Sequence, residues 1–391
     1  MIDFMDIQTA IVAILAFYVA WNLGANDVAN AMGTSVGSQA ITLKQAIIIA
    51  GVLEFLGAVL FGQEVTSTLG TKIANPALFA GTPQTLAMGM ISVLLASGVW
   101  LQIATARGLP VSSSHAVVGA IAGFSWVSLG IEAIDWSSIG LITIGWILTP
   151  IISGVIALSL YSLIQHWIFN QPHPLLQLQE WIPWLSALLL SVFGLIVLPT
   201  IIQSLNRFLP EQGNLHIPPH DISLFITGMA AISLTLISWR QLADGRIENT
   251  IQGLFANFQV LSACFVAFAH GSNDVGNAIA PLAIISYIHQ QGRVPNDQLT
   301  IPLWILVLGA MGIVAGLAAW GKKVIATIGE NIIPLEPSSG FCAELATAIT
   351  ILLASRLGLP VSTSHALVGG VVGIAVVQNI KSVSYTHLTL P

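Results

Sequence analysis

The feature that most restricts the fold of this chain is its succession of apolar segments, several of which run for about 20 residues. A helix of that length crosses roughly 30 Å of hydrocarbon. Only 7% of the residues are charged, whereas a soluble domain carries about 25% charged residues. The sequence therefore predicts an all-α polytopic membrane protein with about 10–12 membrane segments. The expected segments are residues 7–32, 44–62, 84–106, 110–130, 137–164, 182–204, 221–239, 251–288, 301–320, 340–356 and 359–378.

The same composition argues against several classes of function. The eleven Lys and Arg residues are spread over many loops without a basic patch, so no nucleic-acid partner is expected. Cys264 and Cys342 lie in apolar segments and are interpreted as small core residues rather than as a disulfide or a metal site. The first apolar segment has no basic n-region and no small-residue cleavage site, so we expect it to be retained as a helix. These observations predict a multi-pass membrane protein without a bound cofactor.

Two motifs occur twice in the chain, in the same order and at nearly the same separation. The segment GANDVAN, from Gly24, is matched 247 residues later by GSNDVGN, from Gly271. The segment GLPVSSSHAVVGAIAGF, from Gly108, is matched 250 residues later by GLPVSTSHALVGGVVGI, from Gly358. Duplicated halves are typical of transporters, whose substrate site lies where the repeats meet.

This duplication divides the chain into parts. We expect the first repeat over residues 1–165 and the second over residues 251–380. Connecting helices occupy residues 166–250, with the polar stretch Trp239–Thr250 as the linker between the halves. Residues 381–391 form an atypical tail to which we assign no function.

The first motif places carboxylate and amide side chains inside an apolar segment, where a polar group is costly unless it faces a cavity or binds a cation. Gly24 and Gly33 are expected to allow a break in the helix, which would free backbone carbonyls as further ligands. Such oxygen ligands suit a small hard cation such as Na⁺, or a carboxylate that takes up a proton. The alternative is that these side chains only cap a helix or join neighbouring helices by hydrogen bonds. The candidate cation-binding residues are Asn26, Asp27, Asn30, Asn273, Asp274 and Asn277.

The second motif predicts an anion site at the start of a helix. Pro110 and Pro360 end the preceding apolar run, because proline lacks an amide donor and restricts the residue before it. Three hydroxyl residues then open a helix whose first N–H groups are free and whose dipole is positive at that end. Such a helix start is suited to phosphate or sulfate oxygens. The candidate residues are Ser112, Ser113, Ser114, Ser362, Thr363 and Ser364.

Two further carboxylates lie outside the duplicated motifs. Glu54 and Glu344 lie in apolar segments and do not align through the repeat, so each is expected to coordinate a cation, relay a proton or hold a gate. The alternative is a neutral Glu that joins two helices. A Ser-His hydrolase is disfavoured, because neighbouring residues on a helix point about 100° apart and suit proton transfer poorly. Structural zinc at His270 and Asp274 is disfavoured because no further His or Cys is near in the sequence.

With both motif pairs in this order, the chain resembles the inorganic phosphate transporter (PiT) family, from about residue 15 to residue 378. The resemblance implies inverted-topology repeats whose broken helices meet at the membrane midplane. It also implies that Asp27 and Asp274 are essential, with Na⁺ as the hypothesised ion at both. Glu54, Glu344 and His270 match functionally sensitive positions of the family, with coupling or gating roles.

The same resemblance implies a substrate and a coupling ion. Many members move phosphate with Na⁺, others couple to H⁺ or carry metal-phosphate complexes, and some bacterial relatives import sulfate. The second repeat departs from the pattern, because it lacks a counterpart of WSSIGLITIGWILTPIISG, the helix that follows the second motif in the first repeat. The function that the resemblance implies is phosphate import across the cell membrane (plasma or inner membrane), by cation symport with alternating access. A homodimer is a further expectation. Sulfate import is the alternative, and a channel or a membrane enzyme is less favoured.

Overall fold

The structure, a computed structural model, describes residues 4–107, 111–206, 218–244, 251–295, 299–331 and 335–388. Three features of the sequence therefore lie partly outside the described residues. These are Gly108–Pro110 of the first hydroxyl motif, residues 245–250 of the expected linker, and residues 389–391 of the tail.

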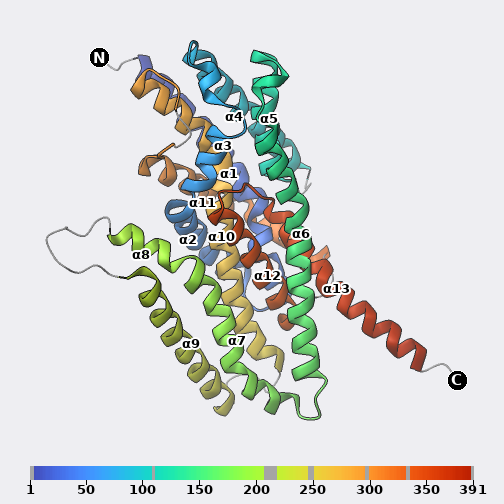
Figure 1. The fold of residues 1–391 in the computed structure, drawn as a ribbon. Coiled ribbons are helices and arrows are strands. Elements are labelled where there is room, and N and C mark those ends of the chain that lie inside the picture. The colour runs from blue at the N-terminus through green and yellow to red at the C-terminus, as the bar shows by residue number, and fades with distance from the viewer. Residues whose placement is uncertain are drawn as a thin grey trace.

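The described part of the chain is built from helices and contains no strand (Figure 1). A single backbone bridge joins Ala74 to Ile134. In chain order the helices are α1 (Phe4–Gly37), α2 (Leu43–Phe61), α3 (Gln63–Thr71), the 3₁₀ turn η1 (Pro76–Phe79), α4 (Pro83–Ala106), α5 (Ser113–Leu129), the 3₁₀ turn η2 (Ile131–Ala133), α6 (Trp136–Ile164), the π-helical turn η3 (Gln165–Phe169), α7 (Pro174–Ile196), α8 (Leu198–Asn206), α9 (Pro219–Ala243), α10 (Ile251–Gln291), α11 (Leu303–Asn331), α12 (Pro337–Arg356) and α13 (Thr363–Leu388).

Nine segments within the described residues are long and apolar enough to cross a membrane. Exposed Leu, Ile, Val and Trp side chains cover their outer faces, which is the expected pattern where the solvent is lipid rather than water. This confirms the all-α polytopic class. The nine spans are Gln8–Gly37, Leu43–Phe61, Pro83–Ala106, Trp136–Phe169, Pro174–Gln203, Pro219–Ala243, Ile251–Gln291, Leu303–Gly321 and Pro337–Arg356.

Side-chain caps specify where several helices begin. Thr42 and Gln45 form a reciprocal capping box at the start of α2. Asp135 accepts hydrogen bonds from two backbone N–H groups at the start of α6, and these bonds lower the pKa of its carboxyl. In the hydroxyl motifs, Ser112 and Ser362 accept from the backbone N–H groups three residues on and so fix the starts of α5 and α13.

The helix break expected at the first motif is not present. Helix α1 runs without interruption through Gly24 and Gly33, and α10 runs in the same way through Gly271. The physical reason is that Gly24 and Gly271 serve close packing: a Cβ at Gly24 would lie 1.9 Å from the carbonyl oxygen of Ile313. The breaks lie instead between α4 and α5 and between α12 and α13, at the two hydroxyl motifs.

The close contacts show that the two repeats are related by an approximate two-fold axis. A Cβ at Gly271 would lie 2.1 Å from the carbonyl oxygen of Glu54, and Glu54 aligns with Ile313, the residue that faces Gly24. Helix α1 of the first repeat therefore packs on α11 of the second, while α10 of the second packs on α2 of the first. This exchange of partners places α1 and α10 side by side in the centre of the molecule.

We expect Gly316→Leu to lower the free energy of unfolding by about 1–3 kcal/mol or more, the usual cost of overpacking. A Cβ at Gly316 would lie 1.8 Å from the carbonyl oxygen of Trp21, a backbone atom that cannot move aside by a rotamer change. Gly228→Leu is the matched control, because no described atom lies within 4 Å of a Cβ at that site. Melting of the two purified variants in one detergent checks the prediction, and equal melting temperatures would contradict it.

Candidate functional site

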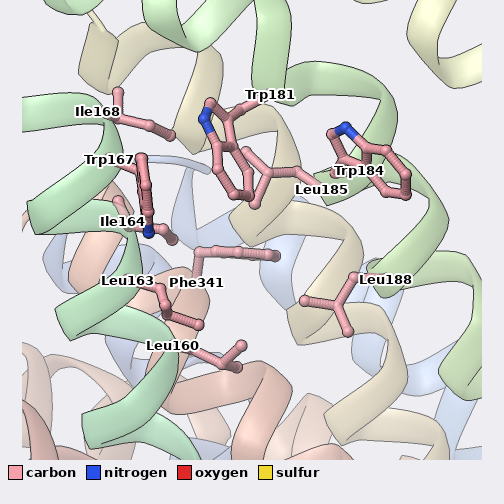
Figure 2. A pocket seen from close by; sticks show the side chains of 10 residues that line it. All are labelled: Leu160, Leu163, Ile164, Trp167, Ile168, Trp181, Trp184, Leu185, Leu188 and Phe341. Carbon is pink, nitrogen blue, oxygen red and sulfur yellow. The ribbon is translucent and has the colours of Figure 1, made fainter.

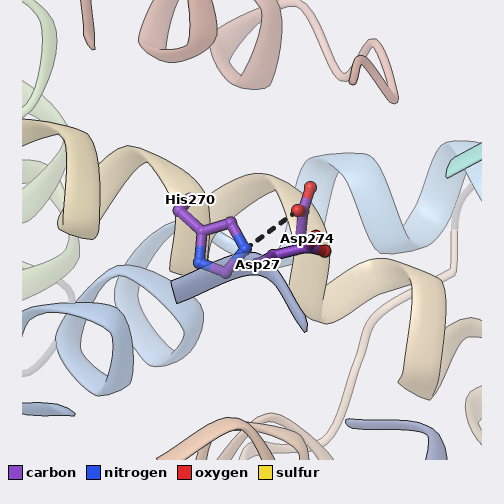
Figure 3. Close-up of side chains that lie close together, drawn as sticks. All are labelled: Asp27, His270 and Asp274. Carbon is purple, nitrogen blue, oxygen red and sulfur yellow. Dashed lines mark ion pairs between the residues drawn. The ribbon is translucent and has the colours of Figure 1, made fainter. Parts of the chain in front are cut away.

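A cluster of ionisable side chains lies where α1 and α10 meet. Asp27 comes from α1, and His270 and Asp274 come from successive turns of α10 (Figure 3). One ligand atom of each residue lies within 4.8 Å of the other two, and all three side chains are buried. The sequence places His270 and Asp274 on one helix face, because they are four residues apart. The position of Asp27 beside them follows only from the packing of α1 on α10.

Amide side chains connect this cluster to the two hydroxyl motifs, each across the repeats. The Asn30 amide donates to Ser364 Oγ at 2.7 Å, and Asn277 donates to Ser114 Oγ at 3.1 Å. Asn30 and Asn277 are repeat equivalents, and so are Ser364 and Ser114. Each half of the site thus combines an Asn-Asp motif from one repeat with a helix start from the other.

The hydroxyl residues at the helix starts divide into two groups. Ser113, Ser114, Thr363 and Ser364 face the cluster, and Thr363 donates to Asp274 Oδ2 at 3.1 Å. Ser112 and Ser362 instead cap their own helices. Ser114 donates to the carbonyl of Val361 at 2.9 Å rather than to an imidazole, so it is not arranged as a hydrolase nucleophile.

The remaining two asparagines join helices, as the alternative interpretation of the motif expected. Asn26 donates to Thr105 Oγ1 on α4, and Asn273 donates to Ser355 Oγ on α12, both at 3.0 Å. These two bonds are also repeat equivalents. Asn273 further accepts from the Val361 backbone N–H. The two side chains therefore hold the ends of α4 and α12 beside the cluster, and Asn273 also fixes the turn before α13.

The composition of the cluster suits a cation. Oδ1 of Asp274 and Oδ1 of Asn277 are buried and have no hydrogen-bond partner among the described residues. Buried oxygens without donors are expensive unless a ligand satisfies them. Among the described residues the cluster and its neighbour Glu54 supply three carboxylates against one imidazole, and the buried polar groups include no Lys or Arg. An added positive charge would offset this excess of negative charge.

The two halves of the cluster differ in one respect. His270 lies between two carboxylates, with Nδ1 3.1 Å from Glu54 Oε1 and Nε2 3.0 Å from Asp274 Oδ2. The repeat equivalents of His270 and Glu54 are Leu23 and Ile313, both fully buried. Asp274 therefore has an imidazole partner, whereas the equivalent position beside Asp27 is apolar.

Comparison with known proteins decides the family. Residues 23–389 match the model of the phosphate transporter family. The chain belongs to the phosphate transporter family. It is therefore a multi-pass membrane protein of a transporter family, and the family expected from the paired motifs is confirmed.

Individual relatives of this family member agree with that placement. A candidate phosphate permease of Haemophilus influenzae is 41% identical over 379 residues, which are 96% of this chain and 89% of that protein. Inorganic phosphate transporter 2-1 of Arabidopsis thaliana, a chloroplastic protein, is 40% identical over 95% of this chain, and the match spans 66% of its own longer sequence. A solved structure described as the sodium-dependent phosphate transporter superposes with a TM-score of 0.84 at 35% identity, covering 97% of this chain and 92% of that one.

A further buried carboxylate of this transporter family member, Glu344, lies outside the cluster. Glu344 Oε1 accepts from Thr34 at 2.5 Å and from Ser35 at 2.7 Å, both near the end of α1. The same carboxylate accepts from Gln259 at 3.2 Å and from Ser262 at 2.8 Å, both on α10. Glu344 therefore ties α12 to α1 and α10 through neutral donors alone.

Glu344 is identifiable from the sequence, but its four hydrogen-bond partners are not. Ser35, Gln259 and Ser262 are polar residues in apolar segments, which is a usable signal, although nothing in their spacing relates them to Glu344. The repeat equivalent of Glu344 is the buried Leu94, so this polar contact also exists in only one half of the molecule.

We expect Glu344→Gln to destabilise the protein by roughly 1.5–3 kcal/mol, the contribution of one hydrogen bond to a charged group. Gln presents an amide N–H₂ where the native carboxylate accepts, so at least one donor of the four loses its acceptor. Glu64→Gln is the control, because Glu64 is an exposed residue of α3. Thermal melting in detergent checks the difference, and a Glu344→Gln variant as stable as the parent would contradict the assigned role.

A pocket elsewhere in the structure does not fit an anion. It lies between α6, α7 and α12, has a volume of about 80 Å³ and is lined by apolar and aromatic side chains (Figure 2). An oxyanion needs hydrogen-bond donors, and this lining offers only indole N–H groups. The lining residues are Leu160, Leu163, Ile164, Trp167, Ile168, Trp181, Trp184, Leu185, Leu188 and Phe341.

Proposed function

We propose that this protein imports inorganic phosphate across the cell membrane by symport with Na⁺, using alternating access between its two repeats. The observation that carries the proposal is the crossed pairing of the motifs, in which Asn30 meets Ser364 and Asn277 meets Ser114. A cation site and an anion site that share residues and straddle the repeat interface are suited to coupled transport.

The helix starts supply the donors for phosphate. Ser113, Ser114, Thr363 and Ser364 contribute hydroxyl groups, and the first turns of α5 and α13 add free backbone N–H groups and positive dipole ends. None of these donors carries a formal charge, so the anion is held without a permanent Lys or Arg counterion and can be released. In the structure Asn30 donates to Ser364, Asn277 donates to Ser113 and Ser114, and Thr363 donates to Asp274. These Asn and Asp side chains would turn toward the cations as phosphate binds.

The cluster supplies the ligands for Na⁺. Asp27 and Asp274 provide the charged oxygens, and the unpartnered Oδ1 of Asn277 adds a neutral one. Bound Na⁺ would offset the charge of phosphate, because a bare dianion in a low-dielectric site is prohibitively costly. If net positive charge moves inward, the membrane potential also contributes about 2.3 kcal/mol per elementary charge for every 100 mV.

Two observations favour these substrates over the alternatives. The relatives and the solved structure are all named for phosphate, which favours phosphate over sulfate. The solved structure is described as sodium-dependent, which favours Na⁺ over H⁺. Glu54 and His270 then hold Asp274 in place, and Glu344 holds α1 against α12. The expected homodimer stays a prediction.

Exchange of labelled phosphate tests the substrate. Proteoliposomes loaded with unlabelled phosphate in Na⁺ on both sides should take up external radiolabelled phosphate, and external phosphate should compete with the label far better than equal sulfate. No exchange under these conditions, or equal competition by sulfate, would contradict the proposed substrate. The variant Ser364→Ala should weaken phosphate binding, while Ser159→Ala, on the exposed face of α6, should leave it unchanged.

A further inference from the structure

The histidines of the two hydroxyl motifs lie close together in the structure. His115 follows Ser114 in the first turn of α5, and His365 follows Ser364 in the first turn of α13. The centroids of the two imidazole rings are 5.3 Å apart. The two residues are repeat equivalents, so the approximate two-fold axis of the repeats passes between the rings. A pair of metal-ligating side chains is thus formed jointly by the two halves of the molecule.

The imidazole nitrogens of this pair take no part in the hydrogen bonds of the described residues. His115 and His365 donate to Ser112 and Ser362 through their backbone N–H groups only. His365 is exposed and His115 is half-buried, and Ser364 between the pair and the cluster is partly exposed as well. The rings can therefore accept a ligand without breaking a hydrogen bond and without unfolding of either helix.

A contact from α6 fixes the position of one ring. Trp146 packs edge-on against His115, with ring centroids 3.8 Å apart, and its indole N–H donates to the carbonyl of Pro360 at 3.0 Å. Pro360 belongs to the same motif as His365. Trp146 thus holds the His115 ring relative to the turn that carries His365, which lowers the entropy lost when both rings bind one ligand.

The spacing of the rings suits a single metal ion. Two imidazoles that bind one tetrahedral Zn²⁺ through nitrogens at about 2.0–2.1 Å have ring centroids roughly 5 Å apart. Imidazole nitrogen suits Zn²⁺, Cu²⁺ and Ni²⁺, whereas Mg²⁺ and Ca²⁺ prefer carboxylate, carbonyl and water oxygens. We propose that His115 and His365 together bind one divalent transition-metal ion, which bridges α5 of the first repeat to α13 of the second.

The bridge inhibits transport. Helices α5 and α13 carry the hydroxyl groups of the two halves of the site, and alternating access moves the repeats relative to each other. An ion bound to both histidines holds the repeats in one arrangement. This consequence rests on the proposed function, whereas binding of the ion depends only on the two imidazoles.

Thermal melting of the purified protein, without a histidine tag and without phosphate, tests binding. Ni²⁺ should raise the melting temperature of the parent, and Mg²⁺ at the same concentration should not. His365→Ala should abolish the shift, and because His365 is exposed this variant should fold normally. His220→Ala, at an exposed position of α9, and Asp274→Asn, in the cluster, should both keep the shift. No shift in the parent, an equal shift with Mg²⁺, or a shift that survives both His115→Ala and His365→Ala would overturn the proposal.

Phosphate exchange in proteoliposomes tests the bridge. Ni²⁺ should inhibit exchange by the parent, and His365→Ala should need at least about ten times more Ni²⁺ for half inhibition, because one of two ligands is lost. Exchange that continues while Ni²⁺ occupies the pair would contradict the bridge. Absence of exchange without any Ni²⁺ would count against the proposed function instead, and the melting shift and its loss in His365→Ala would still decide whether the ion binds.

Discussion

Asp274→Asn is expected to lower Na⁺-driven phosphate uptake at least about 100-fold. The substitution replaces a charged ligand of Na⁺ by a neutral one, and a 100-fold loss corresponds to roughly 3 kcal/mol of binding free energy. The substitution keeps the size of the side chain and its acceptor for Thr363, so insertion and folding should be retained. Initial uptake rates in proteoliposomes at matched protein content measure the effect.

Two further Asp→Asn variants serve as comparisons, one at the equivalent position of the other repeat and one at an exposed position. Asp27→Asn should be similarly inactive, because it removes the other charged oxygen of the cluster. Asp221→Asn, an exposed residue in the first turn of α9, should transport normally. An Asp274→Asn variant with normal uptake and normal Na⁺ dependence would show that Asp274 is not a cation ligand.

The second large effect concerns the pair of Glu54 and His270. His270→Leu alone should destabilise the protein by about 3–5 kcal/mol, because it leaves two buried carboxylates without the imidazole between them. The double variant Glu54→Ile with His270→Leu should recover the part of this loss that comes from Glu54, since that buried carboxylate is removed together with its partner, while Asp274 keeps the hydrogen bond from Thr363.

The chain contains its own reference for that double variant. Leu23 and Ile313 occupy the equivalent buried positions of the other half, so this apolar combination already packs in the same fold. Thermal melting separates the stability effect, and uptake by the recovered double variant then reports the contribution of His270 to transport. A double variant as unstable as His270→Leu would show that charge compensation does not explain the single variant.

Sequence alone could predict the membrane class and the residues of the cluster, because both depend on patterns that repeat. The Asn-Asp motifs and hydroxyl motifs recur in register, so their meeting across the repeats follows from two-fold packing. Glu54 and His270 were identifiable as unusual, although their contact was not, since it joins α2 to α10 across 216 residues.

The continuous helix at Gly24 and the partners of Glu344 could not be predicted, because in each case the same residue pattern occurs in more than one kind of structure. A glycine beside Asn and Asp indicates either a helix break or a close helix contact, and only the position of Ile313 shows that Gly24 serves the contact. The partners of Glu344 come from α1 and α10, and Ser or Thr hydroxyls in apolar helices usually bond to their own backbone, as Thr66 does. Long-range pairing of this kind has no periodic signal.

Separate ion gradients test whether Na⁺ drives phosphate through a site shared by both repeats. Phosphate uptake is measured in proteoliposomes with an inward Na⁺ gradient at equal pH, and then with an inward proton gradient without Na⁺. We expect accumulation with the Na⁺ gradient and none with the proton gradient. Accumulation driven by protons alone, or uptake indifferent to Na⁺, would contradict it.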